Sequence, residues 1–137
     1  MSHRTAARYI NGTYDINYVY DNAGRQSSTT AAGRTLTYQY DAAGNRTRTT
    51  WAEATPFYVT TDFYALNRPA VIKEMGSINL ASYAYDNLSR RATITRGNGT
   101  ITTYGYSTQS ALSSLAHDLA GTAQDIFWVG HKGIGIA

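Results

Sequence analysis

The feature of the sequence that most constrains its fold is a short phrase of two aromatic residues and a turn. Its clearest copy is Tyr-Gln-Tyr-Asp-Ala-Ala-Gly at residues 38–44. Alternation along a strand places both tyrosine rings on one face. Asp is favoured at the first position of a type I turn, and glycine at the fourth position accepts a positive φ at low cost. The phrase therefore predicts a strand that enters a tight turn and returns.

Five copies of this phrase follow one another at intervals of 20 to 23 residues. In the third copy Phe63 replaces the second tyrosine, Tyr64 replaces Asp, and Asn67 replaces Gly. Asn is the next-best residue for a left-handed backbone. This period predicts one β-hairpin per repeat. The motif positions are Tyr18, Tyr20, Asp21 and Gly24; Tyr38, Tyr40, Asp41 and Gly44; Phe63 and Asn67; Tyr83, Tyr85 and Asp86; and Tyr104 and Tyr106.

A second turn is expected inside each repeat, at residues 31–34, 52–56, 75–77 and 96–100. The pair Asn98-Gly99 predicts a type I′ turn, in which both central residues have a positive φ. Aromatic and aliphatic residues alternate with polar ones along the expected strands, so one face is aromatic and the other mostly polar. The prediction is an all-β fold, an antiparallel array of about five hairpins in a curved open sheet.

The last part of the chain departs from the repeat. A sixth copy is due near residue 127, but no Tyr-Asp-x-x-Gly stands there. We therefore divide the chain into a repeat region at 1–112 and a divergent C-terminal segment at 113–137. The apolar residues at 112, 115, 116 and 119 suit either a short helix or two strands around a turn, and continuation of the array favours strands.

Composition excludes several classes of protein. The absence of cysteine removes disulfides, zinc fingers, iron–sulfur ligands and thiol catalysis. The net charge is +3, and the arginines are spread along the chain, so no basic patch predicts a nucleic-acid partner. No apolar run reaches the length of a membrane span, and residues 1–10 lack the apolar core of a Sec-type signal.

The sequence offers no constellation for catalysis. Asp21, Asp41 and Asp86 recur at turn starts, where a side chain bonded to the turn's backbone explains their spacing. No Gly-x-Ser-x-Gly occurs, and Gly97-Asn98-Gly99 lacks the residues and the helix of a phosphate loop. We predict no catalytic residue, cofactor or metal site. The histidines, none at metal-ligand spacing, are His3, His117 and His131.

The abundance of tyrosine permits a second interpretation. The chain holds twelve Tyr but two Trp and three Phe. Packing against neighbouring strands explains the motif tyrosines best. Flat rings can also stack on sugars. Trp51, Tyr58 and Tyr64 are predicted to lie off the aromatic stripe, and they are the candidates for glycan contact. A choline-binding repeat relies on tryptophan pairs, which this chain lacks. An outer-membrane barrel needs a lipid-facing aliphatic band, which strands that alternate tyrosine with polar residues do not supply. Both classes are therefore disfavoured.

The order Gly24-Arg25, Gly33-Arg34 and then the phrase at 38–44 closely resembles the tyrosine-aspartate (YD) repeat of Rhs proteins. Teneurins and the shell-forming component of bacterial Tc toxin complexes share this repeat. The stretches at 41–46 and 65–68 are typical of it, and the resemblance covers about residues 9–112. It implies a large β-sheet that spirals into a hollow shell, which encloses a C-terminal toxin or serves as a cell-surface scaffold.

The resemblance implies a non-catalytic structural segment, secreted or at the surface of a bacterium. Its partners would be neighbouring YD repeats of a larger shell or an enclosed C-terminal toxin. No Asp in the chain precedes a Pro, so the family's self-cleavage region has no match here. A full shell needs more than five repeats, and a fragment or a truncated reading frame is expected. The alternative is a carbohydrate-binding repeat module at the cell surface. Because open edges and an uncovered aromatic face remain, the isolated chain is expected to self-associate.

Overall fold

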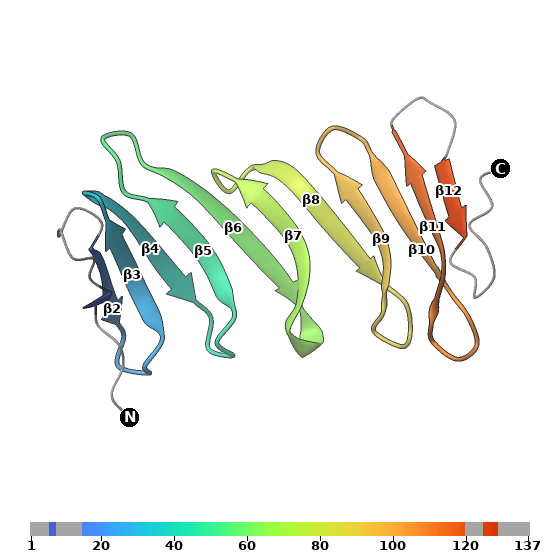
Figure 1. Cartoon of the computed structure of the whole chain (residues 1–137), viewed down its shortest axis with the longest axis horizontal. Helices are drawn as coiled ribbons and strands as arrows, with labels where there is room; N and C mark the ends of the chain where they lie inside the picture. Colours follow the sequence, from blue (N-terminus) through green and yellow to red (C-terminus); the bar gives the residue numbers. More distant parts are fainter. Residues whose placement is uncertain (1–5, 8–14, 120–124, 129–137) are drawn as a thin grey trace.

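The computed structural model describes residues 6–7, 15–119 and 125–128, which form one antiparallel sheet. Twelve strands follow one another across it in sequence order, so strands that are consecutive in the chain are neighbours in the sheet (Figure 1). The predicted all-β fold is confirmed, and two strands extend the array beyond the five hairpins. The strands are β1 (Ala6–Ala7), β2 (Ile16–Tyr20), β3 (Gln26–Ala31), β4 (Arg34–Tyr40), β5 (Arg46–Trp51), β6 (Phe57–Tyr64), β7 (Arg68–Glu74), β8 (Ile78–Tyr85), β9 (Arg91–Arg96), β10 (Ile101–Tyr106), β11 (Leu112–Asp118) and β12 (Asp125–Trp128), with a 3-10 turn η1 (Ala65–Asn67) before β7.

Each of the five repeats is one hairpin of this sheet. The hairpins are β2–β3, β4–β5, β6–β7, β8–β9 and β10–β11. We call the turns that close them the motif turns, and they lie along the lower edge of the sheet in Figure 1. The connecting turns, along the upper edge, join each hairpin to the next. The motif turns are residues 21–25, 41–45, 64–68, 86–90 and 107–111.

Strand register assigns the side chains to two faces. Tyr38 stands opposite Thr49, and Leu36 stands opposite Trp51. Residues directly opposite each other share a face of the sheet. Trp51 therefore lies on the aromatic face, because it stands directly opposite Leu36. The prediction that Trp51 lies off the aromatic stripe is wrong. Tyr58 pairs with Thr50 and lies on the polar face.

Every hairpin contains an irregularity immediately before the second motif aromatic. In the first hairpin Val19 pairs with Ser28 but Tyr20 pairs with Gln26, which leaves Ser27 without a partner. The slip in the third hairpin falls between Asp62 and Phe63, so Phe63 is the structural equivalent of the second tyrosine, as predicted. The residues left unpaired are all small: Ser27, Thr47, Ala70, Ala92 and Ser113.

The described sheet is a single layer with very little core. Among the described residues Ala70 and Ile94 are the buried apolar side chains. The nine aromatic residues of the motif are half-buried, because each packs along the sheet surface and no second layer of described residues covers this face. Cross-strand hydrogen bonds and contacts between neighbouring side chains therefore hold the fold together.

Strands continue into the divergent segment. β11 pairs with β10 and β12, so the preference for β-structure over a helix is confirmed over Leu112–Asp118. The stretch is one continuous strand, and not two strands around a turn. The rest of the tail at 120–124 and 129–137 lies outside the described residues, as do His3 and His131.

The prediction of a type I′ turn at Asn98-Gly99 is wrong. Gly99 has a φ of 85°, but Asn98 does not have a positive φ. The Gly99 N–H donates to the Arg96 carbonyl over 2.9 Å, and the Asn98 side-chain oxygen accepts the Thr100 N–H over 3.1 Å. The Asn98 side chain thus completes a local turn of its own without a positive φ at Asn98. A two-residue turn with positive φ at both positions occurs instead at Ala32 and Gly33, at 48° and 76°.

Candidate functional site

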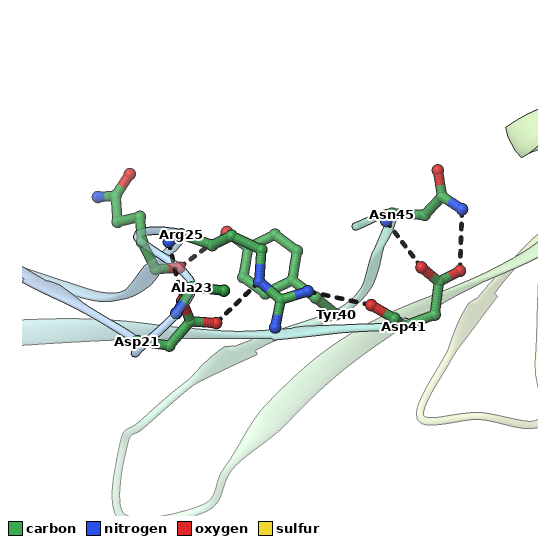
Figure 2. A network of polar contacts seen from close by, with 7 residues as sticks. Asp21, Ala23, Arg25, Tyr40, Asp41 and Asn45 are labelled. Carbon is green, nitrogen blue, oxygen red and sulfur yellow. Dashed lines mark hydrogen bonds and ion pairs between the residues drawn. The ribbon is translucent and has the colours of Figure 1, made fainter. Parts of the chain in front are cut away.

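The motif aspartates organise their own turns. Asp21 Oδ1 accepts the backbone N–H groups of Ala23 and Arg25 over 3.0 and 2.8 Å (Figure 2). The Gly24 N–H donates to the Asp21 carbonyl over 2.9 Å. Asp86 accepts the corresponding pair of backbone N–H groups, both over 2.9 Å. The acidic residues therefore act as turn residues, as the sequence predicted.

The fourth position of each motif turn has a left-handed backbone. Glycine and asparagine occupy it in the first three repeats, and serine adopts it in the last two despite its Cβ. The left-handed conformation predicted for glycine and asparagine is confirmed at three positions, and the two serines adopt it as well. The φ values are 76° at Gly24, 89° at Gly44, 57° at Asn67, 64° at Ser89 and 64° at Ser110.

Hydrogen bonds keep these aspartates ionised. The backbone N–H of Arg25 is the main cause that lowers the pKa of Asp21, and the side-chain amide of Asn45 does the same for the pKa of Asp41. At Asp86 partial desolvation opposes the shift, but bonds from the Arg90 backbone and side chain still leave the pKa lowered. A general acid needs the opposite shift, so these carboxylates serve as hydrogen-bond acceptors.

Arg25 joins its own motif turn to the next one. Its Nε donates to Asp21 Oδ2 over 2.8 Å, and its Nη1 donates to the Asp41 carbonyl over 3.0 Å. The guanidinium carbon lies 4.7 Å from the ring centroid of Tyr40, a distance suited to a cation–π contact. Figure 2 shows the guanidinium between the two turns, beside the Tyr40 ring.

The same arrangement recurs along the lower edge of the sheet. The Arg68 guanidinium lies 4.9 Å from the Tyr85 centroid and donates to Ser89 Oγ over 3.1 Å. In the following repeat the Arg90 guanidinium lies 4.3 Å from the Tyr106 centroid, and its Nη1 donates to a serine of the fifth motif turn over 3.2 Å. Arginine therefore links consecutive motif turns at three of the four steps between the five repeats.

The second motif tyrosine completes each link with its hydroxyl. Tyr40 donates to the Gln26 carbonyl over 2.7 Å. Backbone pairing between β3 and β4 has already ended at Ser28 and Thr37, so this hydroxyl bridges the strands beyond the ladder. We call the arginine and the tyrosine hydroxyl together the inter-repeat clamp. The equivalent hydroxyl bonds run from Tyr85 to the Pro69 carbonyl over 3.1 Å and from Tyr106 to the Arg91 carbonyl over 2.8 Å.

The clamp arginines are the residues that sequence reasoning missed. The signal that identifies them is a basic residue immediately after the left-handed position, as in Gly24-Arg25, Asn67-Arg68 and Ser89-Arg90. Their role was not predictable from alternation, because each contacts the following hairpin. A second pair, Arg46 and Arg91, lies over the first tyrosine of its own hairpin, 4.3 Å from the Tyr38 centroid and 5.1 Å from the Tyr83 centroid.

The three candidates for glycan contact lie in three separate environments. The Trp51 ring packs on Phe57 at 5.3 Å between centroids. The Tyr58 ring lies 3.6 Å from the Arg48 guanidinium carbon, on the other face. Tyr64 lies in a motif turn, with its ring edge-on to that of Tyr85 at 6.3 Å. The described structure therefore does not bring these rings together into one platform.

Other chemistry is sparse in the described part of the chain. No group of three or more His, Cys, Asp or Glu side chains lies close enough to hold a metal ion there. His117 Nδ1 is 2.9 Å from the hydroxyl of Thr102, which also accepts from Arg96. Among the described residues, no helical segment has the length and hydropathy of a membrane span.

Comparison with known proteins supports the Rhs resemblance. The family model named RHS Repeat matches residues 20–55, so an Rhs-type repeat is confirmed there. No curated protein matches. The fold is similar to a chain in the crystal structure of TcdB2-TccC3-Cdc42, with a TM-score of 0.71 and 16% identity. A chain in the crystal structure of TcdB2-TccC3 gives a TM-score of 0.69 at 16% identity. Each comparison covers 83% of this chain and 6% of the other, so the chain spans a small part of the length of these relatives.

Proposed function

We propose that this sheet is a non-catalytic segment of the wall of an Rhs-type shell. The RHS repeat at residues 20–55 and the likeness of the fold to chains of TcdB2-TccC3 support this role. A single-layer sheet with few buried residues suits a wall better than a compact enzyme, since it offers little enclosed volume for a reaction.

The recurring clamp is the observation that carries the proposal. Each clamp joins a hairpin only to its neighbour, which is the contact pattern of a solenoid or array. Such an array lengthens by adding repeats, because each new hairpin finds the same partners on the last one. The expected partners are therefore neighbouring YD repeats, and the wall would enclose a C-terminal toxin or act as a scaffold.

The proposed role as a wall segment also implies how the chain is divided and where the protein is located. Residues 1–112 would form the repeat wall, and 113–137 would form a divergent segment where the motif ends. As part of an Rhs-type shell, the protein would be secreted by a bacterium or lie at its surface. Glycan binding through Trp51, Tyr58 and Tyr64 remains the alternative, although no shared platform supports it.

Electron microscopy of the complete product of the gene that encodes this chain tests the proposal. An epitope tag inserted in the exposed connecting turn at 52–56 and labelled with its antibody fragment marks the position of the segment. We expect a hollow particle with the label on its wall. A solid particle, or a label away from any β-sheet wall, would contradict the proposal.

A matched pair of variants sharpens this test. Replacing Arg25, Arg68 and Arg90 by Ala removes the clamps, and we expect shells that are open or fail to form. Arg34→Ala removes an exposed arginine outside the clamps and should leave the particles intact.

A glycan array with the same protein tests the alternative, because binding that is lost in Trp51→Ala and Tyr58→Ala would favour a carbohydrate-binding module.

A further inference from the structure

One of the four junctions between the described hairpins lacks the complete clamp. At the β5–β6 junction Phe63 replaces the tyrosine, so no hydroxyl reaches the Arg46 carbonyl. By register this carbonyl is equivalent to those that accept the tyrosine hydroxyl at the other junctions, which belong to Gln26, Pro69 and Arg91.

The arginine of the clamp is also replaced at this junction. Asn45 stands in its place, and its amide donates to Asp41 Oδ2 and to Asn67 Oδ1, both over 2.9 Å. This keeps one link between consecutive motif turns. An amide on a short side chain carries no positive charge, however, so the cation–π contact of the other three junctions is absent over Phe63.

The lower half of the β5–β6 junction lacks these side-chain contacts. Backbone pairing runs from Trp51 and Phe57 to Arg48 and Thr60, and it ends at the equivalent position at the other three junctions. At those junctions the arginine and the tyrosine hydroxyl bridge the strands beyond the ladder. An open groove of about 630 Å³ follows the sheet here and extends to Gly76 at a connecting turn. The β5–β6 junction is therefore distinguished by its missing clamp.

The upper half of the same junction is reinforced. The Trp51 and Phe57 rings are in contact at 5.3 Å between centroids. The Arg48 guanidinium carbon lies 3.6 Å from the Tyr58 centroid, the shortest of the described cation–π contacts. The two hairpins are therefore held firmly beside the connecting turn and loosely beside the motif turns.

We propose that the β5–β6 junction is a hinge built into the sheet. Residues 15–51 and 57–119 pivot about the aromatic contacts at the upper edge, and the lower edge opens. Local opening of a fold is favoured where stabilising contacts are missing, and this junction lacks the two side-chain contacts that close its equivalents. A wall assembled from such segments would have a preferred line along which its curvature changes.

Distance measurements between spin labels test the hinge directly. The chain has no cysteine, so two introduced cysteines label it at chosen sites. Asn22, Ala42 and Ala65 occupy the same position in three consecutive motif turns, and all are exposed. We expect a broader distance distribution for Ala42→Cys with Ala65→Cys, across the hinge, than for Asn22→Cys with Ala42→Cys, across a complete clamp. Equal widths would overturn the proposal.

Two reciprocal double variants provide the control. Asn45→Arg with Phe63→Tyr supplies the missing clamp and should narrow the distribution across the hinge. Amide exchange at Thr47 and Thr61 should slow on the order of tenfold, the effect of about one added hydrogen bond. Arg25→Asn with Tyr40→Phe should widen the distribution between Asn22 and Ala42. If the first variant fails to fold by circular dichroism, the second decides, and an unchanged width there refutes the hinge.

Discussion

The turn residues, the arginine and the second tyrosine of the motif make defined hydrogen bonds. The aspartate accepts from the backbone of its own turn, the left-handed residue closes the turn, and the tyrosine donates to the preceding hairpin. The arginine after the turn donates to its own motif turn and to the following one. The aromatic rings are consequently half-buried without any second layer, because cations and neighbouring strands cover them.

Tyr40→Phe tests the hydroxyl of the clamp alone. It removes the bond to the Gln26 carbonyl and leaves the ring in place, so we expect a loss of about 0.5–1.5 kcal/mol in the free energy of unfolding. Chemical denaturation followed by circular dichroism measures it. Tyr64→Phe, at a ring that is 49% exposed, is the control and should change little. A loss of equal size in both variants would mean that the bond contributes nothing specific.

The stability of the fold should depend on pH through the motif aspartates. Their pKa values lie below the ordinary 3.8 in the folded chain. The stabilisation is therefore fully present above about pH 4 and is lost as the pH falls through the lowered values. Thermal unfolding between pH 7 and pH 2 should show a falling melting temperature below pH 4. Replacing Asp21, Asp41 and Asp86 by Asn should flatten that fall, whereas an unchanged slope would contradict this cause.

At the scale of strands and turns, the structure distinguishes two uses of glycine. Gly44 has a φ of 89° with open space around it, so only its backbone conformation matters. At Gly97 a Cβ would lie well inside van der Waals contact with the Asn79 carbonyl oxygen of the neighbouring strand. One glycine permits a turn, and the other permits two strands to approach closely.

Two alanine substitutions separate these uses. Gly44→Ala should cost about 1–2 kcal/mol, the penalty of a left-handed backbone for a residue with a Cβ. Gly97→Ala should cost more, because the β8–β9 strands must move apart. Gly44→Asn should recover most of the first loss, but Gly97→Asn should recover none of the second. Urea unfolding of the four variants gives the comparison, and equal losses at both sites would contradict it.

The hairpins were predictable from sequence because their determinants are local. The phrase Tyr-x-Tyr-Asp-x-x-Gly carries the strand, the turn and its left-handed residue together, and alternation identified Phe63 in the degenerate third copy. The clamp was not predictable, because Arg25 and Tyr40 meet only after two hairpins have docked. The prediction of the turn at Asn98 failed for a different, local reason, since the Asn98 side chain forms a hydrogen bond that competes with the expected backbone conformation.

At the scale of the whole molecule, the sheet presents one aromatic face and two outer strands. Among the described strands β1 and β12 are each paired on one side only. Exposed apolar side chains, among them Trp51, Phe57 and Ile78, lie along the upper part of the sheet. Neighbouring repeats would cover such surfaces in a longer wall.

The isolated chain should therefore self-associate. We expect concentration-dependent sedimentation in analytical ultracentrifugation at micromolar protein, with species larger than the 15.0 kDa monomer. Replacing Trp51 and Phe57 by Thr, which keeps strand propensity, should reduce association through the aromatic face but not through the strand edges. A single monomeric species with a cooperative melt would overturn this prediction.

The unpaired small residue in every hairpin has a geometric consequence. Each slip adds one residue to the returning strand and none to the outgoing strand, always at the same place before the second aromatic. Bulged strands bend and gain right-handed twist. Five identical slips therefore bend five hairpins in the same sense, and each repeat adds the same increment of curvature to the sheet. Adding or deleting one repeat would rotate everything beyond it by a fixed angle and leave its local contacts unchanged.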